Sequence, residues 1–199
     1  MKRLLHIVLG ALILAGCSGD FVALGQLGPP VPASFAVFAE FARDHNKLMK
    51  NGLNRRVYNV VEAQSGTDIQ LASDGSITLQ PGTYRLSGFS LVTMQATFAP
   101  PQPQNNSNYP GYCLVYPVAF ESDIPNLLPN AIVIGSPQTA MDTSPSLFEA
   151  VYTVTETTTI AVGHQSGEDL HDEVYLSVYE VEGIPSDYHV FSRISITRL

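Results

Sequence analysis

The sequence predicts an all-β domain built from two antiparallel sheets, and three observations support this fold class. From about Ser34 onward, nearly every apolar segment is short and rich in Val, Ile, Thr, Tyr and Phe, which favour strands. Gly, Pro, Asn or Asp residues bound these segments and mark turns. No segment of helical periodicity separates them, and no repeat of about 20 to 50 residues is evident. About ten short strands in one domain indicate a two-sheet sandwich of the jelly-roll kind, with a closed barrel as the alternative.

The first expected element is the apolar segment Phe35–Phe41, whose pattern fits two structures. Phe35, Phe38 and Phe41 would share one face of a helix. As a strand, the segment would be buried on both sides, because apolar residues occupy both alternating sets of positions. We expect a strand for at least its first half.

The clearest pair of strands lies in the stretch Gly75–Gly88. Ile77 and Leu79 alternate with polar residues, and Tyr84 and Leu86 do the same after a Pro-Gly turn. This alternation predicts two strands joined by a tight corner.

Further strands are expected along the rest of the chain. The last one is clear because Val190, Ile194 and Ile196 share one face while polar residues occupy the other. The expected ranges are Arg55–Glu62, Thr67–Ala72, Gly111–Phe120, Ala131–Ser136, Leu147–Thr155, Thr157–His164, Glu173–Glu182 and His189–Arg198.

The start of the chain has the three parts of an export signal. Lys2 and Arg3 supply positive charge, and the apolar stretch Leu4–Leu14 is too short to span a bilayer as a helix. Small residues and Cys17 follow. The sequence LAGC at residues 14–17 resembles the lipobox of bacterial lipoproteins, in which the cysteine is acylated. The alternatives are an ordinary secretory signal with an incidental cysteine and a short buried helix.

The lipobox resemblance implies removal of residues 1–16 and lipid on Cys17, with more than one acyl chain for stable anchoring. Ser18 stands where an aspartate would retain such a lipoprotein in the inner membrane, so the resemblance favours the outer membrane. Residues 17–33 are Gly-rich and Pro-rich and are expected to form an extended tether. Residues 34–199 are expected to form one domain.

The chain is acidic, with a formal net charge of −8. Loss of Lys2 and Arg3 with the signal leaves 8 basic and 18 acidic side chains, a net charge of −10. Simple electrostatics therefore argues against nucleic acid and anionic lipid surfaces as partners. With Cys17 acylated, Cys113 has no other cysteine to pair with in the chain. Its apolar, strand-like surroundings predict a buried, inert thiol.

The order of the apolar segments carries a further resemblance. It rests on ITLQPGTYRLSG, CLVYPVAF, AIVIGSP, SLFEAVYTV, TTTIAVGHQ and VYLSVYEVEG, in that order. Across about residues 34–199 the chain is similar to the jelly roll of the complement globular head and tumour necrosis factor, and most of all to the short bacterial and phage members of that group. The better-known members form trimers, so the resemblance implies self-association. The Pro-rich insertion PQPQNNSNYPGY and the lack of a preceding collagen-like stalk depart from the pattern.

Familiar catalytic motifs are absent from the sequence, including the Gly-x-Ser-x-Gly elbow, His-Glu-x-x-His, the Walker loop and Gly-x-Gly-x-x-Gly. One dense polar cluster could hold calcium through oxygens or zinc through histidines. Its candidate ligands are His164, Glu168, Asp169, His171, Asp172 and Glu173. The spacing matches no known ligand loop, so we favour a solvated acidic loop and expect no cofactor.

Two groups of tyrosines are candidates for binding. Tyr109 and Tyr112 lie in the Pro- and Asn-rich stretch Ala99–Tyr112, which suits an adaptable binding loop or a connector that binds nothing. Tyr175 and Tyr179 give the next-to-last expected strand a second apolar face. That strand is therefore either central in its sheet or in contact with another subunit.

These observations predict a non-enzymatic, membrane-anchored lipoprotein whose sandwich binds another macromolecule or itself, with a trimer as the expected assembly and a monomer as the alternative. The alternative function is a carbohydrate-binding or carbohydrate-active module, because jelly rolls commonly serve sugars. The binding sites of sugar-binding modules favour exposed Trp side chains, and this chain has no Trp. A hydrolase is a third option, for which the sequence offers no clear pair of nucleophile and base.

Overall fold

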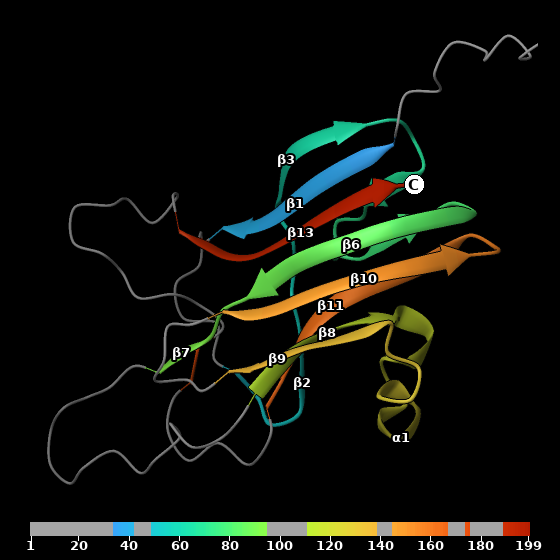
Figure 1. Ribbon diagram of the computed structural model, residues 1–199. Helices are drawn as coiled ribbons and strands as arrows, with labels where there is room; N and C mark the ends of the chain where they lie inside the picture. The colour runs from blue at the N-terminus through green and yellow to red at the C-terminus, as the bar shows by residue number, and fades with distance from the viewer. Residues whose placement is uncertain (1–33, 42–48, 95–110, 139–144, 167–173, 176–188) are drawn as a thin grey trace, which may run out of the picture. The chain divides into compact units, whose positions relative to one another are not determined.

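Two antiparallel sheets contain most of the residues that the structure describes (Figure 1). The structure is a computed structural model, and the described residues are 34–41, 49–94, 111–138, 145–166, 174–175 and 189–199. Within these ranges no helix has the length and apolar character needed to cross a membrane.

The first sheet holds the first and last strands of the domain side by side. Its order is β10 (Ser146–Val154), β6 (Gly82–Ser90), β13 (Val190–Arg198), β1 (Phe35–Phe41) and β3 (Val60–Ser65). The second sheet has the order β4 (Ile69–Leu71), β5 (Ile77–Leu79), β11 (Thr158–Gln165), β8 (Gly111–Pro117) and β9 (Val133–Gln138), with β2 (Leu53–Arg55) also paired to β11. The remaining elements are β7 (Thr93–Met94), β12 (Val174–Tyr175), the 3-10 turn η2 (Val118–Phe120) and the helix α1 (Ile124–Leu127).

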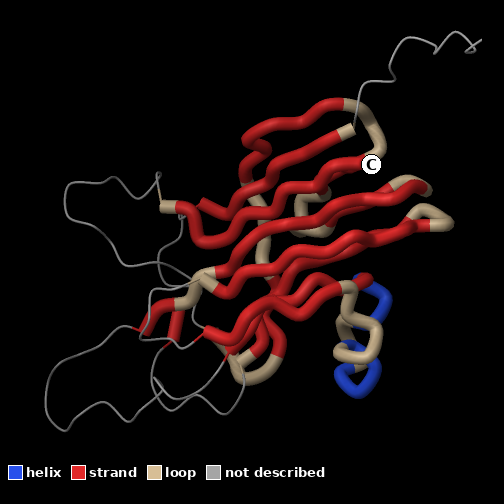
Figure 2. Tube along the Cα trace, viewed as in Figure 1, coloured by secondary structure: helices blue, strands red, loops and turns tan. Residues whose placement is uncertain are grey.

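The path of the chain between the sheets identifies the fold. The chain passes repeatedly from one sheet to the other, and all the strand pairs are antiparallel. Neighbours within a sheet are mostly not consecutive in sequence, as when β13 lies between β6 and β1. This is a jelly-roll sandwich, and the predicted fold class is confirmed (Figure 2).

The predicted Pro-Gly corner joins β5 and β6 and supplies much of the core. Ile77, Leu79, Tyr84 and Leu86 are all fully buried between the sheets. Burial of each such aliphatic side chain contributes about 1.5 to 3 kcal/mol. The Tyr84 hydroxyl donates a hydrogen bond to the Gln80 carbonyl at 2.7 Å, so its polar end is satisfied.

The ambiguous segment Phe35–Phe41 is a strand along its whole length. β1 pairs with β13 on one side and with β3 on the other. Ala36 and Phe38 point into the core and are fully buried. The helix alternative is therefore wrong, because pairing on both sides satisfies the backbone of this segment.

The strand predicted at Arg55–Glu62 is wrong in its middle. β2 ends at Arg55 and β3 begins at Val60, and the residues between them cross from the second sheet to the first. The Asn59 side chain accepts a hydrogen bond from Phe41 N at 3.0 Å and donates one to Phe41 O at 3.1 Å. The Asn59 side chain thus bonds to the backbone of β1 just before β3 begins, a contact that alternation in the sequence does not reveal.

The expectation that no helical segment separates the strands is also wrong. The strand predicted at Gly111–Phe120 ends at Pro117, and η2 and α1 follow it. Leu127 of α1 is buried with Leu114 and Tyr116 on the outer side of the second sheet. The sheet therefore has a second, smaller apolar cluster on this side.

Of the other predicted strands, those that became β4, β9, β10, β11 and β13 agree to within a few residues. Only Val174–Tyr175 of the strand predicted at Glu173–Glu182 lies among the described residues, and it pairs with β7. The predicted export signal, Cys17 and the tether lie outside them.

The two ends of the sandwich differ. At one end, strands meet the internal segments that the structure does not describe, and we name this the loop-bearing end (Figure 1). It is defined by Phe41, Ser90, Gly111, Gln138, Ser146, Gln165 and Val190. The opposite, short-turn end holds Ser34, the turns after β3 and β5, and Arg198.

Candidate functional site

The outer face of the first sheet carries large apolar side chains in contact with solvent. On β10, Leu147 and Val151 keep 56% and 65% of their surface exposed. Phe89 of β6 stands opposite Leu147 in the pairing of these strands and extends the apolar surface. On β1, Phe35 keeps 39% of its surface exposed. Leu147 and Phe89 are therefore adjacent, whereas Thr197 and Arg85 lie between Phe35 and Val151. Contiguous exposed apolar side chains are a common feature of interaction surfaces.

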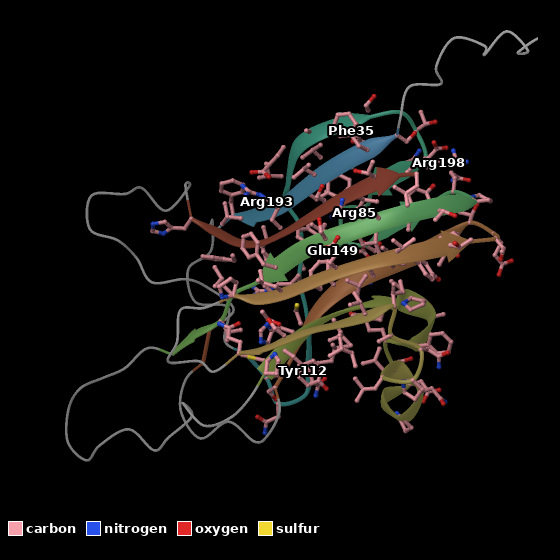
Figure 3. The ribbon with its side chains drawn as sticks, viewed as in Figure 1. Phe35, Arg85, Tyr112, Glu149, Arg193 and Arg198 are labelled. Carbon is pink, nitrogen blue, oxygen red and sulfur yellow. The ribbon has the colours of Figure 1, made fainter. Side chains whose placement is uncertain are left out.

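Charged side chains on this face neutralise one another in pairs, and Figure 3 labels three of them. Arg85 of β6 donates from Nε to Glu149 Oε1 of β10 at 2.9 Å. Arg193 of β13 donates from Nε and Nη2 to the two carboxylate oxygens of Glu62 on β3, each at 2.7 Å. The described part of the face therefore has no net charge, although the chain carries −8.

We name this surface the candidate interface. Its members are Phe35, Arg85, Phe89, Leu147, Val151 and Arg193 with the glutamates that pair with the arginines. Ser87 and Ser195 are partners in register, so the centre of the face carries small side chains. A face of apolar groups and mutually neutralised charges suits contact with another protein surface.

A layer of buried polar side chains closes the core at the loop-bearing end. Across the first sheet, Ser146, Ser90, Ser192 and Glu40 are neighbours in register on four adjacent strands. The serines are fully buried, and Glu40 is 7% exposed. Burial of such groups is costly unless they have hydrogen-bond partners.

Arg56 supplies many of these partners. Its fully buried guanidinium donates from Nε to Ser90 Oγ at 2.8 Å, from Nη1 to Glu40 Oε2 at 3.3 Å, and from Nη2 to the Leu91 carbonyl. Burial lowers the pKa of Arg56, and the nearby Glu40 carboxylate opposes this change. The buried ion pair joins the crossing after β2 to β1, and the hydrogen bond to Ser90 joins it to β6.

The structure places His164, one of the predicted metal ligands, in this polar layer. It lies on β11, is fully buried, and its Nδ1 is 2.8 Å from Ser90 Oγ. Burial, together with the Arg56 guanidinium, lowers the pKa of His164 to about 3. A Cβ on Gly111 would lie 2.9 Å from His164 Nε2, so the imidazole is closely enclosed. His164 is therefore a neutral core residue.

The other predicted metal ligands lie outside the described residues. They are Glu168, Asp169, His171, Asp172 and Glu173. Within the described ranges, no group of three or more His, Cys, Asp or Glu side chains is arranged to hold a metal ion. Ion binding by the acidic loop stays untested.

The Ser90–His164 hydrogen bond has the length expected of a nucleophile and its base, but its surroundings do not suit catalysis. Both side chains are fully buried, and Ser90 Oγ also accepts from Arg56. A substrate could not reach either group without opening the sandwich. We assign this pair to the structure of the polar layer.

Cys113 is buried, as predicted, on the side of the polar layer near β10. It is fully buried, and its Sγ is 3.2 Å from Ser146 Oγ, which donates to it. Burial raises the pKa of the Cys113 thiol. Both properties make it inert.

The predicted binding tyrosines fall in different places. Tyr112 is partly buried on β8 and faces away from the core, beside Pro137 of β9 (Figure 3). Burial raises the pKa of Tyr112. Tyr175 is in β12 and pairs with Thr93 of β7. Tyr109 and Tyr179 lie outside the described residues.

Our reading of the sequence missed the candidate interface, although a signal was present. In the stretch Leu147–Thr155, Leu147 and Val151 alternate with the buried Phe148, so β10 has two apolar faces. The argument that predicts a contact for the strand of Tyr175 therefore holds for β10 as well. The paired arginines and glutamates come from separate strands, and only the folded sheet brings them together.

Comparisons with known proteins give a likeness in shape alone. No family model matches the chain, and no curated protein matches it at a significant level. Among solved structures, it is similar to murine APRIL, a tumour necrosis factor family protein. The crystal structures at pH 8.0 and pH 8.5 have TM-scores of 0.48, and the one at pH 5.0 has 0.47. Each is 9% identical to this chain and covers 84% of it, with 99% of its own length covered. The strand order independently establishes that this chain is a two-sheet antiparallel jelly roll.

Proposed function

We propose that the protein is a non-enzymatic lipoprotein, anchored in the outer membrane through Cys17, whose sandwich assembles with copies of itself or binds a macromolecular partner. The export signal and the LAGC sequence support the anchor. The exposed outer face of the first sheet supports the role in assembly or binding.

The observation that carries the assembly role is the candidate interface. Covering Leu147 and Val151 would contribute about 1 to 2 kcal/mol for each side chain. The net negative charge of the chain opposes association, but exposed charges more than about 8 Å apart are largely screened at physiological ionic strength. Because the face itself is neutral, copies can meet there without bringing like charges together. A cyclic trimer would cover such a face without open-ended growth.

Light scattering on the soluble chain that begins at Ser18 tests this assembly. We expect an oligomeric mass at tens of micromolar protein, and a monomeric mass for Leu147→Glu and for Val151→Glu. Ile134→Glu is the matched control, because Ile134 is 51% exposed on the second sheet. A monomeric wild-type protein, or an oligomer that both variants leave intact, would exclude assembly through this face. Replacing Tyr175 and Tyr179 by Ser tests the tyrosine face predicted from the sequence.

The anchor has a separate test in a Gram-negative host. The full chain should incorporate labelled palmitate and partition into detergent. Cys17→Ser should abolish the labelling and the signal cleavage that follows acylation. A soluble, unlabelled mature form of the wild-type chain would refute the anchor.

A further inference from the structure

Ser34, the first residue that the structure describes, is tied to other segments at the short-turn end. Ser34 is 4% exposed, and its hydroxyl donates to Asp68 Oδ2 in the turn after β3. The same carboxylate oxygen is 2.7 Å from Arg198 Nη1 at the end of β13. Arg198 also donates from Nη2 to the Pro81 carbonyl at 2.9 Å. We name Ser34, Asp68 and Arg198 the clasp.

The backbone around the clasp is shaped to fit it. Arg198 N donates to the Ser34 carbonyl at 2.8 Å. Gly66 has a φ of +76°, and a Cβ there would lie 2.2 Å from Ser34 Oγ. Glycine is required at this turn, because any other side chain would displace the Ser34 hydroxyl and would strain the backbone. The local backbone thus encloses the point at which the chain enters the domain.

β1 leads from the clasp directly to the loop-bearing end (Figure 1). It is an inner strand, with β13 on one side and β3 on the other. Hydrogen bonds between antiparallel strands are perpendicular to the strand direction. A force along β1 must therefore shear these bonds together. A force that separates β1 from β13 at the clasp breaks them one after another.

We propose that the clasp and β1 form a load-bearing junction, which transmits tension from the lipid anchor into the sandwich. This inference rests on the anchor proposed above. The segment before Ser34 joins β1 at the short-turn end, so a pull on this segment that is resisted at the loop-bearing end loads β1 along its axis. The clasp resists the other direction of pull, in which β1 is peeled away from β13.

Single-molecule pulling on the mature chain tests both parts of the proposal. The chain is produced without its signal sequence, so that the free Cys17 thiol carries one handle at the natural attachment point. Cys113 does not compete, because it is buried. The second handle is placed either on Lys50→Cys, at an exposed residue of the loop-bearing end, or at Leu199, which is 69% exposed at the short-turn end.

We expect a higher unfolding force when the handles are at Cys17 and at the cysteine of Lys50→Cys than when they are at Cys17 and Leu199. In the second geometry, Asp68→Asn should lower the force, because the clasp is the first structure loaded. Glu149→Gln is the matched control, since it weakens an exposed ion pair of the same sheet away from the clasp. Both ion pairs are in contact with solvent, although Asp68 is less exposed than Glu149, and such pairs contribute little to equilibrium stability. The two variants should therefore have similar urea midpoints. Ser34→Ala removes one hydrogen bond of the clasp and serves if Asp68→Asn does not fold.

Equal unfolding forces in the two geometries would overturn the load-bearing role of β1. Equal forces for the clasp variants and Glu149→Gln would overturn the role of the clasp. Neither measurement depends on acylation, whereas palmitate labelling tests only the anchor. A failure of this inference is therefore distinguishable from a failure of the proposed function.

Discussion

Acidification is expected to destabilise the protein through His164. In the folded state this side chain is fully buried, and its pKa is lowered to about 3 by burial and by Arg56. In the unfolded chain its pKa is about 6.5. The unfolded state therefore binds a proton first as the pH falls. Stability is lost progressively from about pH 6.5 down to about pH 3.

The expected loss follows from these two pKa values. Within the window, the free energy of unfolding falls by up to about 1.4 kcal/mol per pH unit. Between about pH 7 and pH 5, this single group removes about 2 kcal/mol. The loss is large beside the roughly 5 to 15 kcal/mol that stabilises a typical domain.

Urea denaturation near pH 7 and near pH 5 measures this loss, with His164→Gln as the comparison. Glutamine keeps a polar group near Ser90 and does not titrate, so the variant should lose about 2 kcal/mol less than the wild type over this range. Effects of carboxylates are common to both chains and cancel in the difference. The same loss in both proteins would refute the assignment of the proton to His164.

Other predictions concern the polar layer. Arg56→Ala leaves Glu40 buried without its ion-pair partner and should cost about 3 to 5 kcal/mol in urea denaturation, much of it recovered by Arg56→Met with Glu40→Leu. Gly111→Ala places a Cβ 2.9 Å from His164 Nε2 and should cost about 1 to 3 kcal/mol, measured by thermal unfolding. In the Cys17→Ser chain, Cys113 should react with a thiol reagent only in denaturant, and rapid labelling of that chain in its native state would contradict the buried position of Cys113.

Strand positions were predictable where alternation and turn residues agree. Ile77, Leu79, Tyr84 and Leu86 are core residues on either side of a Pro-Gly corner, because side chains of a strand alternate between its two faces. The burial of Cys113 was predictable for a similar reason, since Cys113 lies in an apolar strand. Such patterns depend only on neighbouring residues, so they can be recognised without knowing which strands pair.

Residues whose environment depends on distant segments were not predictable. His164 lies next to an acidic stretch, and this sequence context predicts a candidate metal ligand. In the structure, β11 places it in the core beside Ser90 and Arg56. The crossing at residues 56–59 has the composition of a strand. At its end, the Asn59 side chain hydrogen-bonds to the backbone of Phe41, and β3 begins only at the next residue, Val60.

The sequence by itself determined the all-β class, the main strands and the acidic charge, because alternation, turn residues and charge depend only on neighbouring residues or on composition. Only the tertiary structure decided which faces are covered. The neutral pairs Arg85–Glu149 and Arg193–Glu62, the polar layer and the clasp each join strands far apart in the chain. Their partners are chosen by strand order and register, which are long-range properties of the two sheets.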